Sequence, residues 1–146
     1  YPPTIIGGAA FSKYVDELRI EANDVGEGLL ILDGGNFFQG NPLGLADGGY
    51  TMIEWMNRIG YDAMVPGNWE FFYKNDHLLD LIELAKFPVI AYNLTDKDWE
   101  EPVLDQYIIR KIGELKIAII GYTYPWTALT SAITGAAKMY NFISFL

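Results

Sequence analysis

Hydrophobic positions along the chain follow a helical spacing in some segments and form short continuous runs in others. Apolar residues recur every three or four positions in three segments, which predicts amphipathic helices over residues 8–23, 50–59 and 76–86. Each segment is followed by a short apolar run, which predicts strands over residues 29–32, 63–65 and 89–91. This alternation indicates right-handed crossovers and a mainly parallel sheet, and therefore an α/β fold.

The connecting segments refine this picture. The continuous apolar run over residues 29–32 is typical of a strand that is buried on both faces, and residues 33–49 are expected to form a long glycine-rich loop. Gly60 is placed to end the second helix in a left-handed conformation. Two runs rich in β-branched residues, 106–110 and 116–120, predict a hairpin attached to the sheet.

Composition and charge exclude several classes of partner. The chain has 146 residues, 51% of them hydrophobic, and its 10 basic against 19 acidic residues give a formal net charge of −9. We expect a single domain over residues 1–146, with no binding to nucleic acid or to anionic membranes, because both need a basic surface. The sparsely charged residues 121–146 are too rich in polar side chains to form a good membrane span. Because residue 1 is a tyrosine, we expect the chain to be cut or processed from a longer polypeptide.

Few side chains for metal or acid–base chemistry are present. There is no cysteine, which excludes disulfides and thiolate metal sites. The single histidine, His77, stands beside Asp76 at the start of the third helix, where a solvated polar position is favoured over a ligand role. Asn93, followed by Leu and Thr, matches a glycosylation acceptor. Four tryptophans are candidate interface anchors: Trp55, Trp69, Trp99 and Trp126.

Two polar loops, residues 33–40 and 66–71, follow the first and second predicted strands. Open α/β sheets bind ligands beyond the carboxyl ends of their strands, so these loops are the candidate site. Their glycines and asparagines are also what tight turns require, and spacing alone favours that structural role. No phosphate-binding P-loop, Gly-x-Gly-x-x-Gly or Gly-x-Ser-x-Gly pattern occurs in the chain.

Together, the loops resemble a known family. Residues 31–40 (ILDGGNFFQG) are similar to the Leu-Asp-x-Gly-Asp-x-x-Gln-Gly stretch of the 5′-nucleotidase-type metallophosphoesterases, which have a calcineurin-like fold. Residues 59–71 resemble the family's Gly-Tyr-Asp-Ala-x-x-x-Gly-Asn-His-Glu-Phe block, and residues 87–93 resemble its next strand. Residues 69–71 and 119–127 are most similar to the thiosulfohydrolase branch of bacterial sulfur oxidation. The resemblance runs from Gly7 and Gly8 to about Trp126.

This resemblance implies a layered β core flanked by helices, of which the chain is part of an αββα domain. It also implies two divalent ions, Mn²⁺ or Zn²⁺, that activate water to hydrolyse a small phosphate ester or sulfur-oxyanion substrate in nucleotide catabolism or sulfur oxidation. Members of the family are usually exported, which favours an extracytoplasmic or periplasmic location. The metal-site positions match Asn36 and Asn68, and Asp33 and Glu70 stand beside them as supporting residues.

The chain departs from the family at two of these positions. Asn36 replaces the bridging aspartate and Trp69 replaces the catalytic histidine, so no catalytic residue is intact, while Asn68 matches the family's asparagine ligand. Two dications about 4 Å apart repel by roughly 15–20 kcal/mol at a dielectric constant near 20, and a neutral amide does not offset that repulsion. We expect the chain by itself to hold no metal pair and to be inactive or weakly active.

Three hypotheses remain open from the sequence. The family's Asp-x-His motif would precede Gly7, and its later histidines would follow Trp126, so the chain is either a piece of a longer hydrolase or a degenerate homologue. Asn36 and Trp69 favour degeneracy, because truncation does not change internal residues. A non-catalytic binding or structural subunit is the alternative, with a protein-contact surface at Phe37, Phe38, Trp69 and Trp126. In the third hypothesis, a complete protein supplies the missing ligands and Asn36 is a neutral one.

Overall fold

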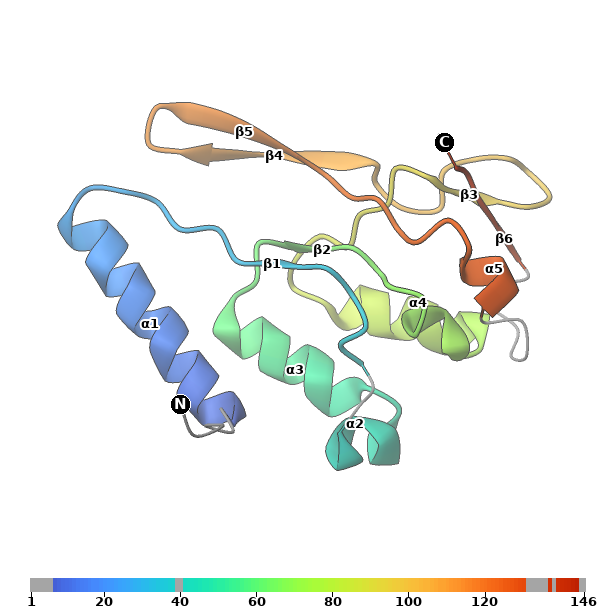
Figure 1. The fold of residues 1–146 in the computed structure, drawn as a ribbon, viewed down its shortest axis with the longest axis horizontal. Helices are drawn as coiled ribbons and strands as arrows, with labels where there is room; N and C mark the ends of the chain where they lie inside the picture. Colours follow the sequence, from blue (N-terminus) through green and yellow to red (C-terminus); the bar gives the residue numbers. More distant parts are fainter. Residues whose placement is uncertain (1–6, 39–40, 131–136, 138, 145–146) are drawn as a thin grey trace.

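The computed structural model describes residues 7–38, 41–130, 137 and 139–144. Helices and strands alternate over the first two thirds of the chain, and strands dominate the last third (Figure 1). The helices are α1 (Gly8–Asp24), α2 (Pro42–Asp47), α3 (Tyr50–Ile59), α4 (Asn75–Leu84) and α5 (Thr127–Thr130), with a 3₁₀ turn at Glu70–Phe72. The strands are β1 (Leu32–Asp33), β2 (Ala63–Met64), β3 (Leu94–Asp96), β4 (Tyr107–Ile112), β5 (Leu115–Ile120) and β6 (Tyr140–Phe142).

A short parallel sheet lies at the centre of the molecule. β1 pairs with β2 in parallel, with Leu32 opposite Ala63, and a parallel bridge joins Met64 to Val89 on the other side. The strands β1 and β2 therefore end at the same edge of the sheet. Figure 1 shows α1, α3 and α4 on one side of these strands and the β4–β5 hairpin on the other. The predicted α/β order and the parallel pairing of the central strands are confirmed, but the β3–β6 and β4–β5 pairs are antiparallel.

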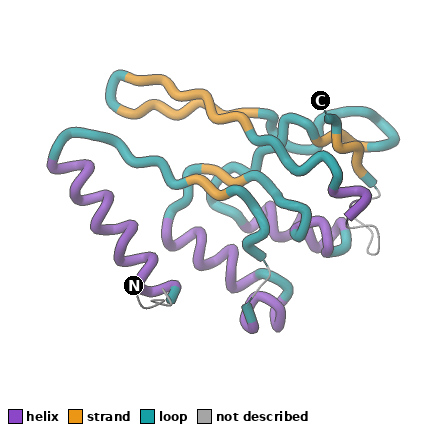
Figure 2. Tube along the Cα trace, in the orientation of Figure 1, coloured by secondary structure: helices purple, strands orange, loops and turns teal. Residues whose placement is uncertain are grey.

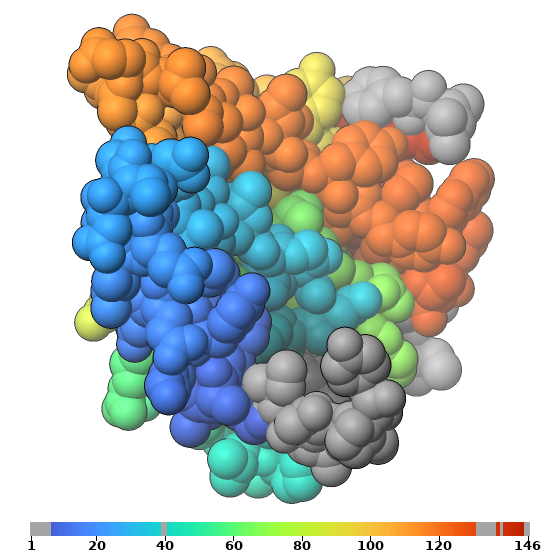
Figure 3. Space-filling model, turned by 60° about the vertical axis from the view of Figure 1, so that its left-hand side comes forward, coloured from blue at the N-terminus to red at the C-terminus, as the bar shows by residue number. Residues whose placement is uncertain are grey.

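The predicted hairpin is also present. β4 and β5 pair antiparallel from Tyr107 opposite Ile120 to Ile112 opposite Leu115, and Gly113 takes a positive φ of 57° in the turn. At its base, a bridge between Ile90 and Asp105 attaches the hairpin to the central strands. Figure 2 shows the hairpin as the longest stretch of paired strand, and Figure 3 shows it projecting above α1. Strands β3 and β6 form a separate antiparallel pair.

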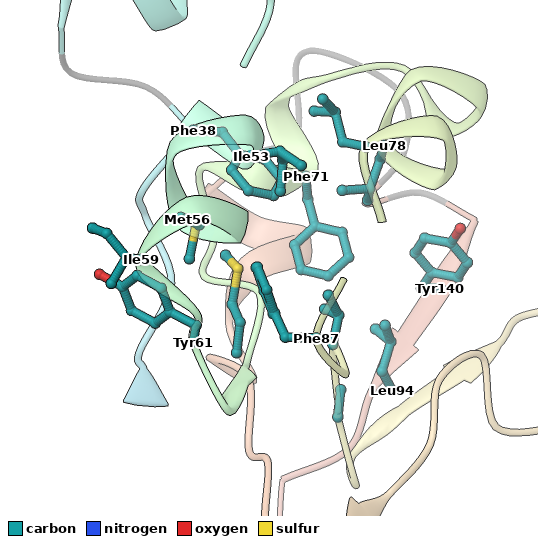
Figure 4. Close-up of a cluster of buried hydrophobic side chains, with 14 of the residues drawn as sticks. Phe38, Ile53, Met56, Ile59, Tyr61, Phe71, Leu78, Phe87, Leu94 and Tyr140 are labelled. Carbon is teal, nitrogen blue, oxygen red and sulfur yellow. The ribbon is translucent and has the colours of Figure 1, made fainter. Parts of the chain in front are cut away.

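The helices pack on the sheet through the faces that their apolar periodicity predicts. Ile53, Met56 and Ile59 of α3 are buried, and so is Leu78 of α4 (Figure 4). Leu81 of α4 is buried as well. Burial of each such side chain contributes about 1.5–3 kcal/mol relative to exposure. These contacts hold the helices against the strands whose ends carry the two candidate loops.

The segment predicted to be one long loop contains a helix. Asn41 caps α2 by accepting a hydrogen bond of 2.8 Å from the Gly44 N–H, and Pro42 occupies the first turn, where its missing N–H costs nothing. Gly48 ends α2 in the left-handed conformation. The prediction of an uninterrupted loop over residues 33–49 was wrong because α2 has only six residues, too few to show a helical periodicity.

The strand predicted over residues 29–32 was wrong in its burial. The paired strand begins at Leu32, which is half exposed, and with Ile90 and Ile120 it lines an open apolar groove. In the described part of the chain, no element covers this face of β1. Residues 89–91 are buried, but they make isolated bridges in place of the predicted strand. Among the described residues, no helix is long and apolar enough to cross a membrane.

Candidate functional site

A buried carboxylate joins the loops that follow β1 and β2. Glu70 is fully buried, and its two oxygens accept four backbone hydrogen bonds. Oε2 accepts from Asn36 at 2.6 Å and from Gly67 at 2.8 Å, and Oε1 accepts from Phe37 at 2.8 Å and Phe38 at 3.1 Å. Three of these donors belong to the first loop and one belongs to the second. Glu70 therefore fixes the backbone of both loops.

The electrostatic setting of Glu70 combines two opposing effects. Burial raises its pKa above the ordinary value of a glutamate, and the four N–H donors act in the opposite direction. The side chain comes from the 3₁₀ turn at the end of the second loop, and its carboxylate reaches backbone donors more than thirty residues earlier in sequence. The resemblance predicts Glu70 as a supporting residue, and its contacts are to backbone, not to another side chain.

Asn36 and Trp69 are direct partners. The Trp69 N–H donates a hydrogen bond of 3.0 Å to Oδ1 of Asn36, and the Asn36 N–H is held by Glu70. Asn36 adopts a positive φ of 64°, a conformation that asparagine tolerates better than most residues. Gly67 packs against it so closely that an added Cβ would lie 2.3 Å from Oδ1 of Asn36. The two positions at which the chain departs from the family, Asn36 and Trp69, are thus in direct contact.

An open cleft of about 460 Å³ lies at these strand ends. Asn36 and Asn68, the two predicted metal-site residues, both line it. The remaining lining residues are Gly34, Pro66, Gly67, Tyr122, Thr123, Tyr124 and Pro125. The contribution of residues 122–125 was missed, although this segment follows β5 as the two loops follow β1 and β2.

A buried polar network fixes the wall of the cleft. Asn93 donates from Nδ2 to the carbonyls of Thr123 at 2.9 Å and Ile143 at 3.1 Å, and its Oδ1 accepts from the Thr123 N–H at 2.9 Å. The Thr123 hydroxyl donates to the Pro66 carbonyl at 2.5 Å. This network ties the segment after β5 to the loop after β2. It also corrects the glycosylation prediction, because the Asn93 amide is buried and already bonded.

Asp33 is part-buried, whereas the Trp69 side chain is half exposed. Asp33 accepts a hydrogen bond of 2.7 Å from the Gly35 N–H, and burial raises the pKa of its carboxyl group. It borders the apolar groove beside β1 and is not part of the cleft lining. The Trp69 side chain is 50% exposed and packs beside Phe72, with ring centroids 6.1 Å apart.

Two predicted aromatic contact residues are packed inside. Phe38 is buried, because its backbone is drawn inward by Glu70, so its place on an exposed contact surface was wrong. Trp55 stacks on Phe37 with ring centroids 5.3 Å apart and also contacts Phe11. Trp55 therefore joins α1 and the first loop to α3 through part-buried ring contacts.

His77 also differs from its prediction. Its Nε2 lies 2.7 Å from the Gly48 carbonyl, and its ring meets the rings of Tyr50 and Tyr73 at centroid distances of 5.3 Å and 4.8 Å. A carbonyl only accepts, so Nε2 carries the proton. The expected solvated position was wrong because the end of α2, which was not predicted, lies against the imidazole. Within the described residues, no three His, Cys, Asp or Glu side chains gather as a metal site would require.

Comparison with known proteins identifies the relatives of this chain. No family model matches it. A 5′-nucleotidase from Vibrio vulnificus is 37% identical over 122 residues, which are 84% of this chain and 22% of the relative. The NAD nucleotidase NadN of Haemophilus influenzae has a TM-score of 0.78 and 26% identity over 94% of this chain and 26% of its own.

The sulfate thiohydrolase SoxB of Thermus thermophilus shares the fold, with a TM-score of 0.84 and 23% identity over 91% of this chain and 24% of its own. The chain spans about a quarter of the length of these proteins or less, so it has the fold of a partial domain. The α/β fold class expected from the resemblance is confirmed by these neighbours. Over most of its length, the chain is homologous to the N-terminal part of the 5′-nucleotidases, a hydrolase family of calcineurin-like phosphoesterases.

Proposed function

We propose that this chain is part of a hydrolase domain whose relatives cleave small phosphate or sulfur-oxyanion esters with divalent metal ions, and that by itself it is inactive or weakly active. One observation carries this proposal: Oδ1 of Asn36 accepts the Trp69 N–H at 3.0 Å. The residues that match the family's bridging carboxylate and catalytic histidine are thus bonded to one another and hold the two loops together.

The donor set supports this proposal. A bridging carboxylate offers two anionic oxygens, whereas Asn36 offers one neutral oxygen that is already engaged by a backbone N–H. Asn68 lines the same cleft as a second neutral amide. The buried Glu70 carboxylate accepts four backbone hydrogen bonds, and the part-buried Asp33 accepts one at Oδ1. These residues do not fit a pair of Mn²⁺ or Zn²⁺ ions, whose mutual repulsion requires anionic ligands.

A second candidate function is non-catalytic binding. Trp69 and Trp126 are each 50% exposed. In the segment after β5, every second residue is an exposed aromatic side chain: Tyr122, Tyr124 and Trp126. Such residues are enriched where proteins contact partners. We also propose, from the family resemblance, that the protein is exported to an extracytoplasmic or periplasmic location. The assignment to the thiosulfohydrolase branch is likewise a proposal.

A hydrolysis assay tests the proposal. The purified chain is incubated with p-nitrophenyl phosphate and Mn²⁺, beside a double variant, Asn36→Asp with Trp69→His, that restores the two family residues. We expect no turnover above the metal-only background for the unmodified chain. Rapid turnover by the unmodified chain would overturn the proposal. Gain of metal-dependent turnover in the double variant alone would identify positions 36 and 69 as the cause of the loss.

A further inference from the structure

Among the described residues, no charged side chain lines the cleft at the strand ends. Its described lining consists of glycines, prolines, two asparagines, a threonine and two tyrosines, in a chain with a formal net charge of −9. An oxyanion bound there would meet no lysine, arginine or imidazolium, and the acidic chain would repel it. Without a metal pair, the cleft is therefore unfavourable for the anionic substrates of the relatives.

The polar groups of the cleft suit a neutral ligand instead. Asn36 and Asn68 are amides, which combine donors and acceptors. The Oδ1 of Asn36 is held by Trp69, which fixes the amide plane, and its Nδ2 has no hydrogen-bond partner among the described residues. Tyr122 and Tyr124 are each nearly half exposed beside these amides and add apolar ring faces and hydroxyl groups.

The cleft is also held in shape before any ligand arrives. Glu70 fixes one wall with four hydrogen bonds, and the Asn93–Thr123–Pro66 network fixes the other. A pre-formed site loses less conformational entropy on binding. Its volume of about 460 Å³ lies within the range of small-molecule sites.

We propose that this cleft binds a neutral polyhydroxylated ligand, such as a sugar, through the amides of Asn36 and Asn68 and the ring of Tyr124. The replacement of the family's bridging aspartate by Asn36 and of its catalytic histidine by Trp69 would then convert a metal-dependent anion site into an uncharged sugar site. This inference rests on the proposed function in one respect, because a bound metal pair would make the same cleft attract anions.

Saturation-transfer NMR on the 146-residue chain in EDTA tests this proposal. The probes are the methyl glycosides of glucose, galactose and mannose, with glucose 6-phosphate as the matched anion. We expect saturation transfer to at least one glycoside and at least tenfold weaker binding of glucose 6-phosphate. Tyr124→Ala should weaken glycoside binding about fivefold. Substitution of Tyr107, a similarly exposed tyrosine on the hairpin, by alanine should leave it unchanged.

Two results would overturn the proposal. One is the absence of saturation transfer to all three glycosides, and the other is binding of glucose 6-phosphate in EDTA that equals or exceeds that of the glycosides. A repeat with Mn²⁺ separates this inference from the proposed function. Stoichiometric Mn²⁺ together with tight glucose 6-phosphate binding would contradict both, whereas no metal and no glycoside binding would contradict the sugar site alone.

Discussion

The Trp69 N–H and Oδ1 of Asn36 are joined by a hydrogen bond of 3.0 Å across the loops that follow β1 and β2. By the sequence resemblance, these two residues match the positions of the family's catalytic histidine and bridging aspartate. The bond engages one lone pair of the only oxygen that the Asn36 side chain could offer to a metal ion. It also makes position 36 a structural link between the loops, which can be tested by substitution of its neighbours.

Replacement of Glu70 by glutamine should destabilise the fold. An amide NH₂ in place of either oxygen would face two N–H donors and leave them unsatisfied, which costs about 2–3 kcal/mol. Urea unfolding followed by fluorescence measures this loss. Glu54→Gln, on the exposed side of α3, is the matched control and should change the unfolding free energy by less than about 0.5 kcal/mol. Equal effects of the two variants would argue against a structural role for Glu70.

Gly67 and Gly34 provide a test of the loop contact. An alanine Cβ at position 67 would lie 2.3 Å from Oδ1 and 2.8 Å from the backbone nitrogen of Asn36, so Gly67→Ala should push the loops apart at a cost of about 2 kcal/mol. Gly34 has no atom within 4 Å of the added Cβ, and Gly34→Ala should be nearly neutral. The ¹⁵N–¹H resonance of Trp69 should shift in the first variant only. A neutral Gly67→Ala would contradict the described contact.

The Thr123 hydroxyl should contribute more to folding stability than the hydroxyl of a surface threonine. Thr123→Val keeps the shape of the side chain but leaves the Pro66 carbonyl without its partner at 2.5 Å, which costs about 1–2 kcal/mol. Thr130→Val, on the exposed face of α5, should have little effect on stability. Thermal or urea unfolding compares the two variants. A smaller loss for Thr123→Val than for Thr130→Val would show that the network does not hold the cleft wall.

Deprotonation of Tyr61 should lower the free energy of unfolding at alkaline pH. Burial, together with the nearby Asp33 carboxylate, raises the pKa of Tyr61 from 10.0 to about 12. Its folded-state pKa lies above the unfolded value, so its contribution is fully present below pH 10 and is lost as pH rises through 12. Relative to Tyr61→Phe, the unmodified chain should lose about 1–2 kcal/mol over this range, allowing for partial exposure. Parallel stability curves for the two proteins would contradict the raised pKa.

The sequence predicts the long helices and the hairpin because their patterns are local. The apolar face of α3, with Ile53, Met56 and Ile59, is visible as a three- and four-residue spacing, and Gly60 marks its end. The alternating exposure along β4 is equally local. These elements need no information about distant residues.

The remaining features depend on contacts between distant segments. Leu32 belongs to an apolar run typical of full burial, but its exposure depends on which element covers β1. Tyr122 and Thr123 line the cleft because the base of the hairpin pairs with Ile90, a contact between distant segments. The capture of four backbone N–H groups by Glu70 likewise required the folded loops, and no spacing in the sequence indicates it.

The central claim is that Asn36 and Trp69 leave this chain without a metal pair. Equilibrium dialysis of the 146-residue chain against Mn²⁺ and Zn²⁺, with bound metal counted per polypeptide, tests it before any substrate is chosen. The account predicts no stoichiometric ion at micromolar free metal. Two ions per chain at that concentration would contradict it, because Asn36, Asn68 and the neighbouring carboxylates would then have assembled the site that their present hydrogen bonds oppose.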